Sequence, residues 1–223
     1  MGPQLQDRSE AGRRLAAALA RYAGRSDVLV LALPRGGVPV GFEVARRLRA
    51  PLDVFVVRKL GVPGHEEVAM GAIASGGLRV FNRRLVERLG ITPAAIERVT
   101  SVETRELERR ERAYRGDRPP TLVHGRTIIL VDDGLATGAT MTAAIEALRL
   151  GDPARIVVAA GVGAPQACAA VSGLADECVC AVRPPVLDGV GRWYADFSPT
   201  TDAEVRDLLE RAAQDLAVPA PAR

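Results

Sequence analysis

The sequence predicts an α/β fold in which a five-stranded parallel sheet is flanked by helices. Five runs of mainly aliphatic residues have the length of single strands, and helical patterns separate most of them. Such runs are typical of strands buried on both faces, and strands that alternate with helices form parallel sheets with right-handed crossovers. Two of the runs end in loops of small residues directly before a helix. The five runs are 28–33, 52–57, 127–131, 155–162 and 177–182.

Length and composition indicate one globular unit, residues 1–223. Hydrophobic residues make up 48% of the chain, and a formal net charge of +3 is too small and too dispersed to indicate a nucleic-acid partner. No apolar run approaches the ~20 residues that span a membrane, and the first residues show no signal-peptide core. We therefore expect a cytoplasmic protein without a membrane partner.

Helical segments are expected between the strands. An amphipathic helix capped by Ser9 is predicted over 8–22, because Leu15, Ala18, Leu19 and Tyr22 form one stripe. Further helices are predicted over 38–49, 165–174 and 201–213, and residues 217–223 are expected to be a frayed tail.

Three segments depart from the simple alternation of strands and helices. Residues 58–81 are expected to form a mobile flap and a returning hairpin, because glycine and proline stand among charged residues near the start of the segment. Residues 82–120 are expected to be a helical insertion with a solvated face of Glu/Arg pairs, and residues 183–216 a small hood with the last helix. The expected pairs are 106/110, 108/112 and 111/115.

The three cysteines, Cys168, Cys178 and Cys180, predict reduced thiols rather than a disulfide framework. Cys178 and Cys180 are two residues apart in a predicted strand, so they share one face. We interpret them as small buried side chains, because a metal site would need more ligands nearby.

The loop after the run 127–131 combines acids with small residues. Asp132 and Asp133 end this predicted strand, and the residues from Ala136 to Thr140 are small or hydroxylated. Carboxyl ends of parallel strands are where such sheets bind ligands. A tight turn before a helix, with Thr140 as the cap, gathers backbone N–H groups and the positive end of the helix dipole. One loop thus offers carboxylates for hydroxyls or a metal, and a pocket for a phosphate monoester.

Two other protein classes share part of this pattern. Receiver domains of response regulators place an Asp-Asp pair near the start of the domain and lack the Thr-Gly-x-Thr that follows here. A Walker A loop needs a spacing and a lysine that Gly134 to Thr140 lacks. The strand, the acid pair and Ala-Thr-Gly-Ala-Thr together resemble the phosphoribosyl pyrophosphate (PRPP) signature of type I phosphoribosyltransferases.

This resemblance implies a type I phosphoribosyltransferase-like fold and a role for each loop. Asp132 and Asp133 would hold the ribose hydroxyls and help to bind Mg²⁺. A second strand-loop-helix would bind the pyrophosphate, across a cis peptide bond between Arg35 and Gly36. The residues implied for the 5-phosphate are Ala136, Thr137, Gly138, Ala139 and Thr140, and those implied for the pyrophosphate are Arg35, Gly36 and Gly37.

Lys59 is the only lysine among 30 basic residues, which indicates a need for a compact ammonium group on a flexible stem. In orotate-type members of the family a basic flap closes over PRPP. By this resemblance Arg58, Lys59 and His65 are the expected catalytic groups. A solvated hairpin with incidental charge is the alternative.

The hood is expected to bind the acceptor. Trp193 and Tyr194 offer flat faces to a heterocycle, and Asp196 is expected to face the metal together with Asp132 and Asp133. Aromatic-x-Asp-aromatic resembles the C-terminal signature of 6-oxopurine enzymes. The alternative is that Trp193 fills the core or a dimer interface.

The acceptor itself is not assigned. Enzymes of the 6-oxopurine type carry an aspartate where this chain has Ala136, and Ala-Thr-Gly is more similar to the adenine-type signature. We expect Mg²⁺-dependent transfer of ribose 5-phosphate from PRPP to a nitrogenous acceptor, a nucleobase, by a homodimer without a nucleic-acid partner. A non-catalytic PRPP-sensing regulator on the same fold is the alternative.

Overall fold

A five-stranded parallel sheet forms the core, as the sequence predicts. The computed structural model describes residues 4–116 and 118–217. The strand order is β2, β1, β6, β7, β8, so the order reverses between β1 and β6. Ala32 pairs with Val131 near the carboxyl ends of these two strands, and the loops that leave them therefore start side by side. The strands are β1 (Val28–Ala32), β2 (Leu52–Val54), β6 (Thr127–Leu135), β7 (Arg155–Gly163) and β8 (Glu177–Val182).

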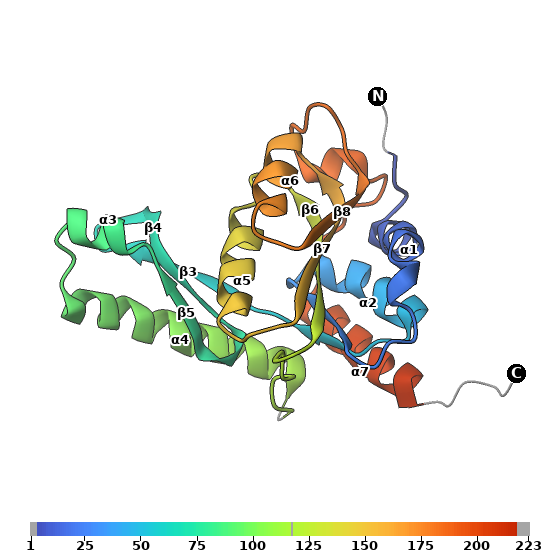
Figure 1. Cartoon of the computed structure of the whole chain (residues 1–223), viewed down its shortest axis with the longest axis horizontal. Helices are drawn as coiled ribbons and strands as arrows, with labels where there is room; N and C mark the ends of the chain where they lie inside the picture. The colour runs from blue at the N-terminus through green and yellow to red at the C-terminus, as the bar shows by residue number, and fades with distance from the viewer. Residues whose placement is uncertain (1–3, 117, 218–223) are drawn as a thin grey trace, which may run out of the picture.

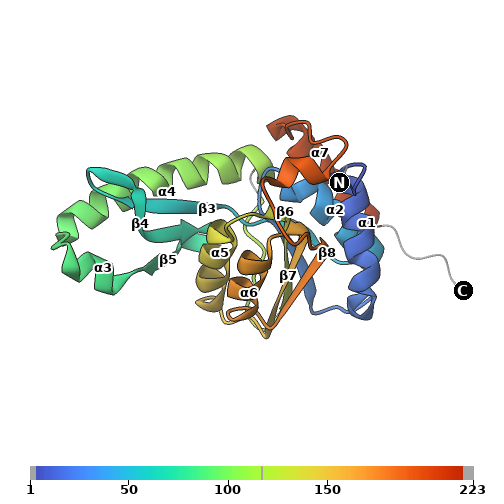
Figure 2. The same ribbon diagram turned by 90° about the horizontal axis from the view of Figure 1, so that it is seen from above.

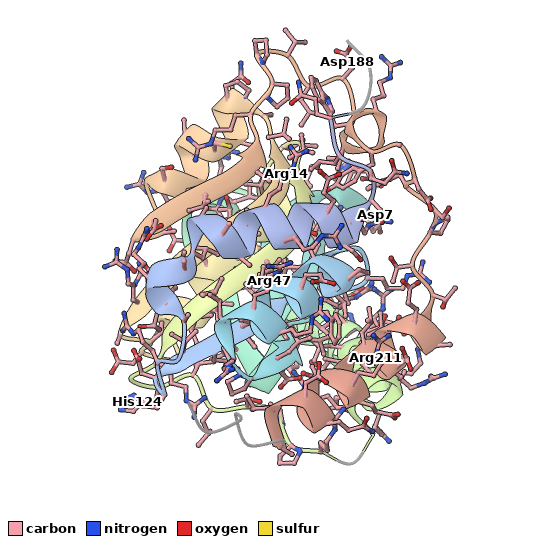
Figure 3. The ribbon with its side chains drawn as sticks, turned by 90° about the vertical axis from the view of Figure 1, so that its right-hand side faces the viewer. Asp7, Arg14, Arg47, His124, Asp188 and Arg211 are labelled. Carbon is pink, nitrogen blue, oxygen red and sulfur yellow. The ribbon has the colours of Figure 1, made fainter. Side chains whose placement is uncertain are left out.

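Helices bury both faces of the sheet (Figure 1). Along β1, Val28 and Val30 pack on the side of α1 (Arg8–Ala18) and α2 (Gly37–Leu48). Leu29 and Leu31 alternate with them and pack against α5 (Ala139–Arg149) and α6 (Pro165–Ser172). This alternation explains why the strand is apolar at every position. Figure 3 shows α1, α2 and α7 (Asp202–Ala217) side by side, with Asp7 at the start of α1.

Three antiparallel strands and two helices form an arm that extends from the core (Figure 2). The strands are β3 (Val57–Val62), β4 (His65–Ala74) and β5 (Leu78–Phe81), and the helices are α3 (Arg83–Arg88) and α4 (Pro93–Arg115). Three short 3₁₀ segments complete the described chain, η1 (Ala20–Tyr22), η2 (Ser75–Gly77) and η3 (Val190–Trp193).

The expected mobile flap is wrong in its local structure, because its residues pack as strands. Leu60 and Val62 are buried with Met70 in the cluster that α4 and α7 cover. Gly61 sits at a bulge of the β3–β4 pairing, where a Cβ would lie 2.7 Å from the Glu66 carbonyl oxygen. Glycine therefore permits a close strand crossing here rather than a loop. β4 starts at His65, so residues that were expected in the mobile part of the flap lie in a strand.

Two predicted helix caps are also corrected. Asp7 caps α1 in place of Ser9, because its carboxylate precedes the first helical residue and accepts from Glu10 N–H at 2.7 Å. α5 starts at Ala139 after Gly138, whose φ is +77°, so Thr140 already lies inside the first turn.

The expected helical insertion, residues 82–120, is divided into α3 and α4, because Gly90 takes a positive φ between them. The expected tail lies outside the described residues, apart from Ala217.

The expected ion pairs on α4 have different outcomes. Glu106/Arg110 lies at the surface, Glu111/Arg115 is buried, and Glu108/Arg112 is not an ion pair among the described residues. Glu106 pairs with Arg109 and Arg110 on the exposed side.

The Arg115 side chain is 5% exposed, and its guanidinium bonds Asp53 at 2.7 Å and Glu111 at 2.6 Å. Asp53 also accepts from Thr121 Oγ1 at 3.0 Å. This network joins α4, the edge strand β2 and the segment before β6.

No helix among the described residues has the length and apolar character needed to cross a membrane.

We predict that Asp53→Ala lowers the free energy of unfolding by about 3 kcal/mol, because it leaves a buried guanidinium without its main partner. Asp207→Ala is the matched control, since it breaks an exposed pair with Arg211 on α7 and should cost less than about 1 kcal/mol. Urea denaturation of both variants measures the difference. Equal losses would show that the buried network is not a stabilising element.

Candidate active site

The two small-residue loops meet at the carboxyl edge of the sheet. The loop after β1 leads through Gly36 into α2, and the loop after β6 leads through Gly138 into α5. A Cβ on Gly36 would overlap the Asp133 carboxylate, and a Cβ on Gly37 would lie 2.7 Å from the Val131 carbonyl oxygen. Only residues without side chains let the loops approach this closely. The edge therefore brings the acid pair against the first loop.

The cis peptide bond of the first loop joins Pro34 and Arg35, so the predicted Arg35–Gly36 position is wrong by one residue. Gly36 already has helical backbone angles, with φ −62° and ψ −29°, so the turn is completed before it. The Arg35 side chain is exposed, and its guanidinium lies 3.7 Å from Asp202 at the start of α7. Arg35 therefore flanks this loop with a cation.

The first N–H groups of α2 are already bonded within the turn, because Gly37 N–H donates to the Leu33 carbonyl oxygen at 3.0 Å and Val38 N–H donates to the Arg35 carbonyl oxygen at 3.1 Å. The next residue, Pro39, has no N–H group.

Asp132 and Asp133 experience different surroundings. Asp133 forms an ion pair with Arg8 at 2.9 Å, and the Arg8 guanidinium also lies 3.9 Å from the centre of the Phe197 ring. Among the described residues, Asp132 has no such ion pair and accepts only from Asp133 N–H, at 2.8 Å. Loss of hydration, followed by the negative charge of Asp133, raises the pKa of Asp132 well above its usual range. Asp132 therefore ionises less readily than an ordinary aspartate.

The N-terminus of α5 has the form of an anion cradle. Gly138 adopts the left-handed conformation, and no side chain caps the helix in the part of the chain that the structure describes. The Thr137 hydroxyl accepts weakly from Ala139 N–H at 3.3 Å. Thr140 is exposed, and the N–H groups of the first turn face outward from the helix end. Free N–H groups and the helix dipole favour a bound phosphate here.

Two of the three basic residues expected on the flap, Arg58 and Lys59, line one pocket between the hairpin and α4. Arg58 faces α4 and is held by Glu103 at 2.6 Å. Lys59 pairs with Ala72 across β3 and β4, so it projects from the opposite face, and its ammonium lies 3.6 Å from the exposed Glu67 carboxylate. His65 is exposed at the far end of the hairpin. Strand alternation therefore directs the two side chains away from β3 on opposite faces, although both residues line the pocket beside α4.

A cleft of about 420 Å³ lies between the arm and the anion cradle. Ala72 of β4 and Val80 of β5 line it from the arm, and Thr137 and Ala139 line it from the cradle. Lys59 shares a strand face with Ala72, but it lines the pocket beside α4 and is not among the residues that line this cleft.

The hood covers the end of β6, but its side chains make other contacts than the predicted ones. Tyr194 is 4% exposed, its ring stacks on Phe197, and its hydroxyl donates to the Asp133 carbonyl oxygen at 2.7 Å. The expected stacking of Tyr194 on an acceptor is wrong for this arrangement, because the ring is covered. Trp193 is half-buried, and its carbonyl oxygen accepts from Leu5 N–H at 3.0 Å.

Asp196 also differs from the expected metal ligand. Its carboxylate accepts from both the backbone N–H and the hydroxyl of Ser198, at 2.9 and 2.6 Å. These bonds lower the pKa of Asp196. In the described part of the chain, ligand atoms of Asp132, Asp133 and Asp196 do not gather within 4.8 Å of one another. Asp196 therefore shapes the hood turn, and its predicted role as a metal ligand is not supported.

Arg8 is the functional residue that sequence reasoning missed. It lies 125 positions before Asp133, in a helix whose pattern indicates only packing, so no local signal points to it. The hydroxyl of Tyr194 was missed for the same reason. The sequence reflects this contact at Gly161, where a side chain is excluded because a Cβ would overlap the Tyr194 hydroxyl.

The comparisons with known proteins match this geometry. Residues 3–186 match the family model described as the phosphoribosyl transferase domain. The chain belongs to this family. A Mycobacterium tuberculosis (strain H37Rv) protein named "Putative phosphoribosyl transferase" is 46% identical over 211 residues, which is 95% of this chain and 47% of that protein. The match covers most of this chain, but the chain spans only about half the length of the curated relatives it matches.

Solved structures show the same fold. The crystal structure of TT1426 from Thermus thermophilus has a TM-score of 0.84 and 40% identity, and the match covers 93% of this chain and 98% of that one. A hypothetical protein from Neisseria gonorrhoeae with bound ppGpp has a TM-score of 0.50 and 14% identity, over 95% of this chain and 98% of that one, so it supports the fold alone. The type I phosphoribosyltransferase-like fold is therefore confirmed.

The raised pKa of Asp132 predicts how stability changes with pH. In the folded protein Asp132 keeps its proton to a higher pH than in the unfolded chain, where an aspartate titrates at about 3.9. The free energy of unfolding therefore falls as the pH rises above about 4. Asp132→Asn removes this loss. In a metal chelator, we expect the variant to gain stability relative to the natural protein as the pH increases from about 4 to 7. Urea denaturation at several pH values tests this, and a pH-independent difference would contradict it.

Proposed function

We propose that this phosphoribosyl transferase domain binds PRPP and transfers its ribose 5-phosphate group to a nitrogenous acceptor, a nucleobase, with release of pyrophosphate. The 5-phosphate lies on the cradle from Ala136 to Thr140, and Asp132 and Asp133 hold the ribose hydroxyls. The pyrophosphate lies on the loop of Arg35, Gly36 and Gly37. One observation carries the proposal: the two anion-binding loops adjoin across Gly36 and Asp133, with the acid pair between them.

The arrangement of the loops suits a ligand with phosphates at both ends of a sugar. The sugar hydroxyls need acceptors, which the carboxylates supply, and each phosphate needs N–H donors, which a helix start or the loop before it supplies. Transfer of the ribosyl group makes the anomeric carbon cationic, and fixed carboxylates nearby stabilise that charge. The Arg35 guanidinium and the backbone N–H groups of the loop before α2 stabilise the departing pyrophosphate.

The donor set also fits Mg²⁺. Asp132 carries a carboxyl group whose charged form is disfavoured by burial and by Asp133, and a hard divalent cation would relieve that repulsion. Mg²⁺, when bound, neutralises charge on the pyrophosphate as it leaves. Arg8 bonds Asp133 and sets the orientation of its carboxylate.

The acceptor side is proposed from the arm and the hood. Lys59 shares a strand face of the arm with Ala72, and its ion pair with exposed Glu67 is weak enough to exchange for a phosphate oxygen. Trp193 keeps a half-exposed side chain beside the end of β6 and is the proposed contact for the acceptor ring. Catalytic roles for Arg58 and His65, the homodimer and the cytoplasmic location stay predictions.

We predict that Asp132→Asn combined with Asp133→Asn abolishes Mg²⁺-dependent PRPP binding in calorimetric titration. Because Asp133 is paired with Arg8, the variant is also expected to lose some stability, so its fold is checked by circular dichroism before titration. Asp152→Asn, an exposed change in the loop before β7, is the control and should bind normally. Undiminished PRPP affinity in the folded double variant would overturn the proposal.

Turnover is tested by screening nucleobases for pyrophosphate release from PRPP. With the active acceptor, Lys59→Ala should lower turnover more than PRPP affinity, and Lys59→Arg should restore only part of it, because guanidinium is broad and planar. Arg79→Ala removes a cation from the opposite face of the arm and should leave turnover unchanged. Full activity of Lys59→Arg would show that the lone lysine has no special role. Tight PRPP binding without release for any base would favour a PRPP sensor.

A further inference from the structure

Three thiols gather on the face of the sheet that α6 covers. Cys178 and Cys180 project from one face of the edge strand β8, and Cys168 projects toward them from α6. The Sγ atoms of Cys168 and Cys180 are 3.4 Å apart, and all three sulfur atoms lie within 4.8 Å of one another. The chain has three cysteines in total, so every thiol of this protein is in this cluster.

Gly163 makes room for the cluster. It ends β7 next to β8, and a Cβ there would overlap Cys168 Sγ and lie 2.6 Å from Cys180 Sγ. Three thiols that only filled the core would not need a glycine beside them, because cysteine packs as a small apolar residue. Cys178 and Cys180 are also only half-buried, so ions from solvent reach the cluster.

A guanidinium group lies beside the cluster. Arg183 is fixed there by a 2.7 Å hydrogen bond to the Cys178 carbonyl oxygen. Three thiolates and one divalent cation carry a net charge of −1, which this guanidinium balances.

We propose that Cys168, Cys178 and Cys180 bind one thiophilic cation of the Zn²⁺ type through three metal–sulfur bonds. Each thiol that is still protonated releases its proton to solvent as its bond forms. A Zn–S bond of about 2.3 Å in a tetrahedral site separates the sulfur atoms by about 3.8 Å, which small side-chain rotations provide here. Water from the exposed side of β8 completes the coordination.

This site is separate from the oxygen ligands of the anion loops. Soft thiolates select Zn²⁺, Cd²⁺ or Cu⁺, whereas carboxylates and phosphates select Mg²⁺. The two sites are nevertheless adjacent, because Ala167, next to Cys168 on α6, packs 3.3 Å from the position of a Cβ on Gly138. A metal that joins α6 to β8 would therefore also fix the helix that supports the cradle.

Cd²⁺ is the probe for this site, because thiolate ligands give it an ultraviolet charge-transfer absorption. The full chain, reduced and freed of metal, is expected to bind one Cd²⁺ with that absorption. Cys178→Ser should weaken binding by about 100-fold or more, since even groups that only support a ligand contribute about 10–100-fold. The metal is also expected to raise the melting temperature of the natural protein but not that of Cys178→Ser.

Ala181→Ser is the matched control, because it adds a hydroxyl to β8 on the opposite face and leaves the three thiols in place. It should bind Cd²⁺ like the natural protein, and so should Asp132→Asn. Equal Cd²⁺ affinity in Cys178→Ser and the natural protein would overturn the proposal. So would Cd²⁺ binding without the thiolate absorption, or conversion of the reduced protein to a Cys168–Cys180 disulfide in place of metal binding.

Discussion

The contact between the loop after β1 and the acid pair after β6 is the constraint on which the rest of the molecule depends. The Asp133 carboxylate occupies the space that a Gly36 side chain would need. That approach requires β1 and β6 to be neighbours, and hence the reversal of strand order at this point. The Arg35 guanidinium and the N-terminus of α5 then lie at the same edge as the acid pair, and the proposed function rests on this arrangement.

The N-terminal segment and the hood pack over this edge of the sheet. Leu5 pairs with Tyr194, and Arg8 at the start of α1 bonds both Asp133 and the Ser198 carbonyl oxygen. Val190 fills the space over Gly134. Segments from near both ends of the described chain therefore close over the acid pair. Such enclosure lowers the local dielectric and raises the pKa of Asp132, which is a cost in stability that a ligand-binding site commonly carries.

The arm and the cysteine cluster lie on opposite sides of the cradle. The arm lines the cleft with Ala72 and Val80, while α6 carries Ala167 against Gly138 and Cys168 against β8. The loop before α5 therefore lies between the arm and α6.

The sequence by itself determined the five-stranded parallel sheet and the two loops of small residues that follow β1 and β6. Aliphatic periodicity and small residues next to strand ends are local patterns, and backbone N–H geometry follows from them directly. Only the tertiary structure decided that Arg8 pairs with Asp133, that Tyr194 is buried, and that the expected flap is a packed arm. These outcomes depend on contacts between residues far apart in the chain, such as the 125 positions between Arg8 and Asp133. Local propensity contains no term for such contacts.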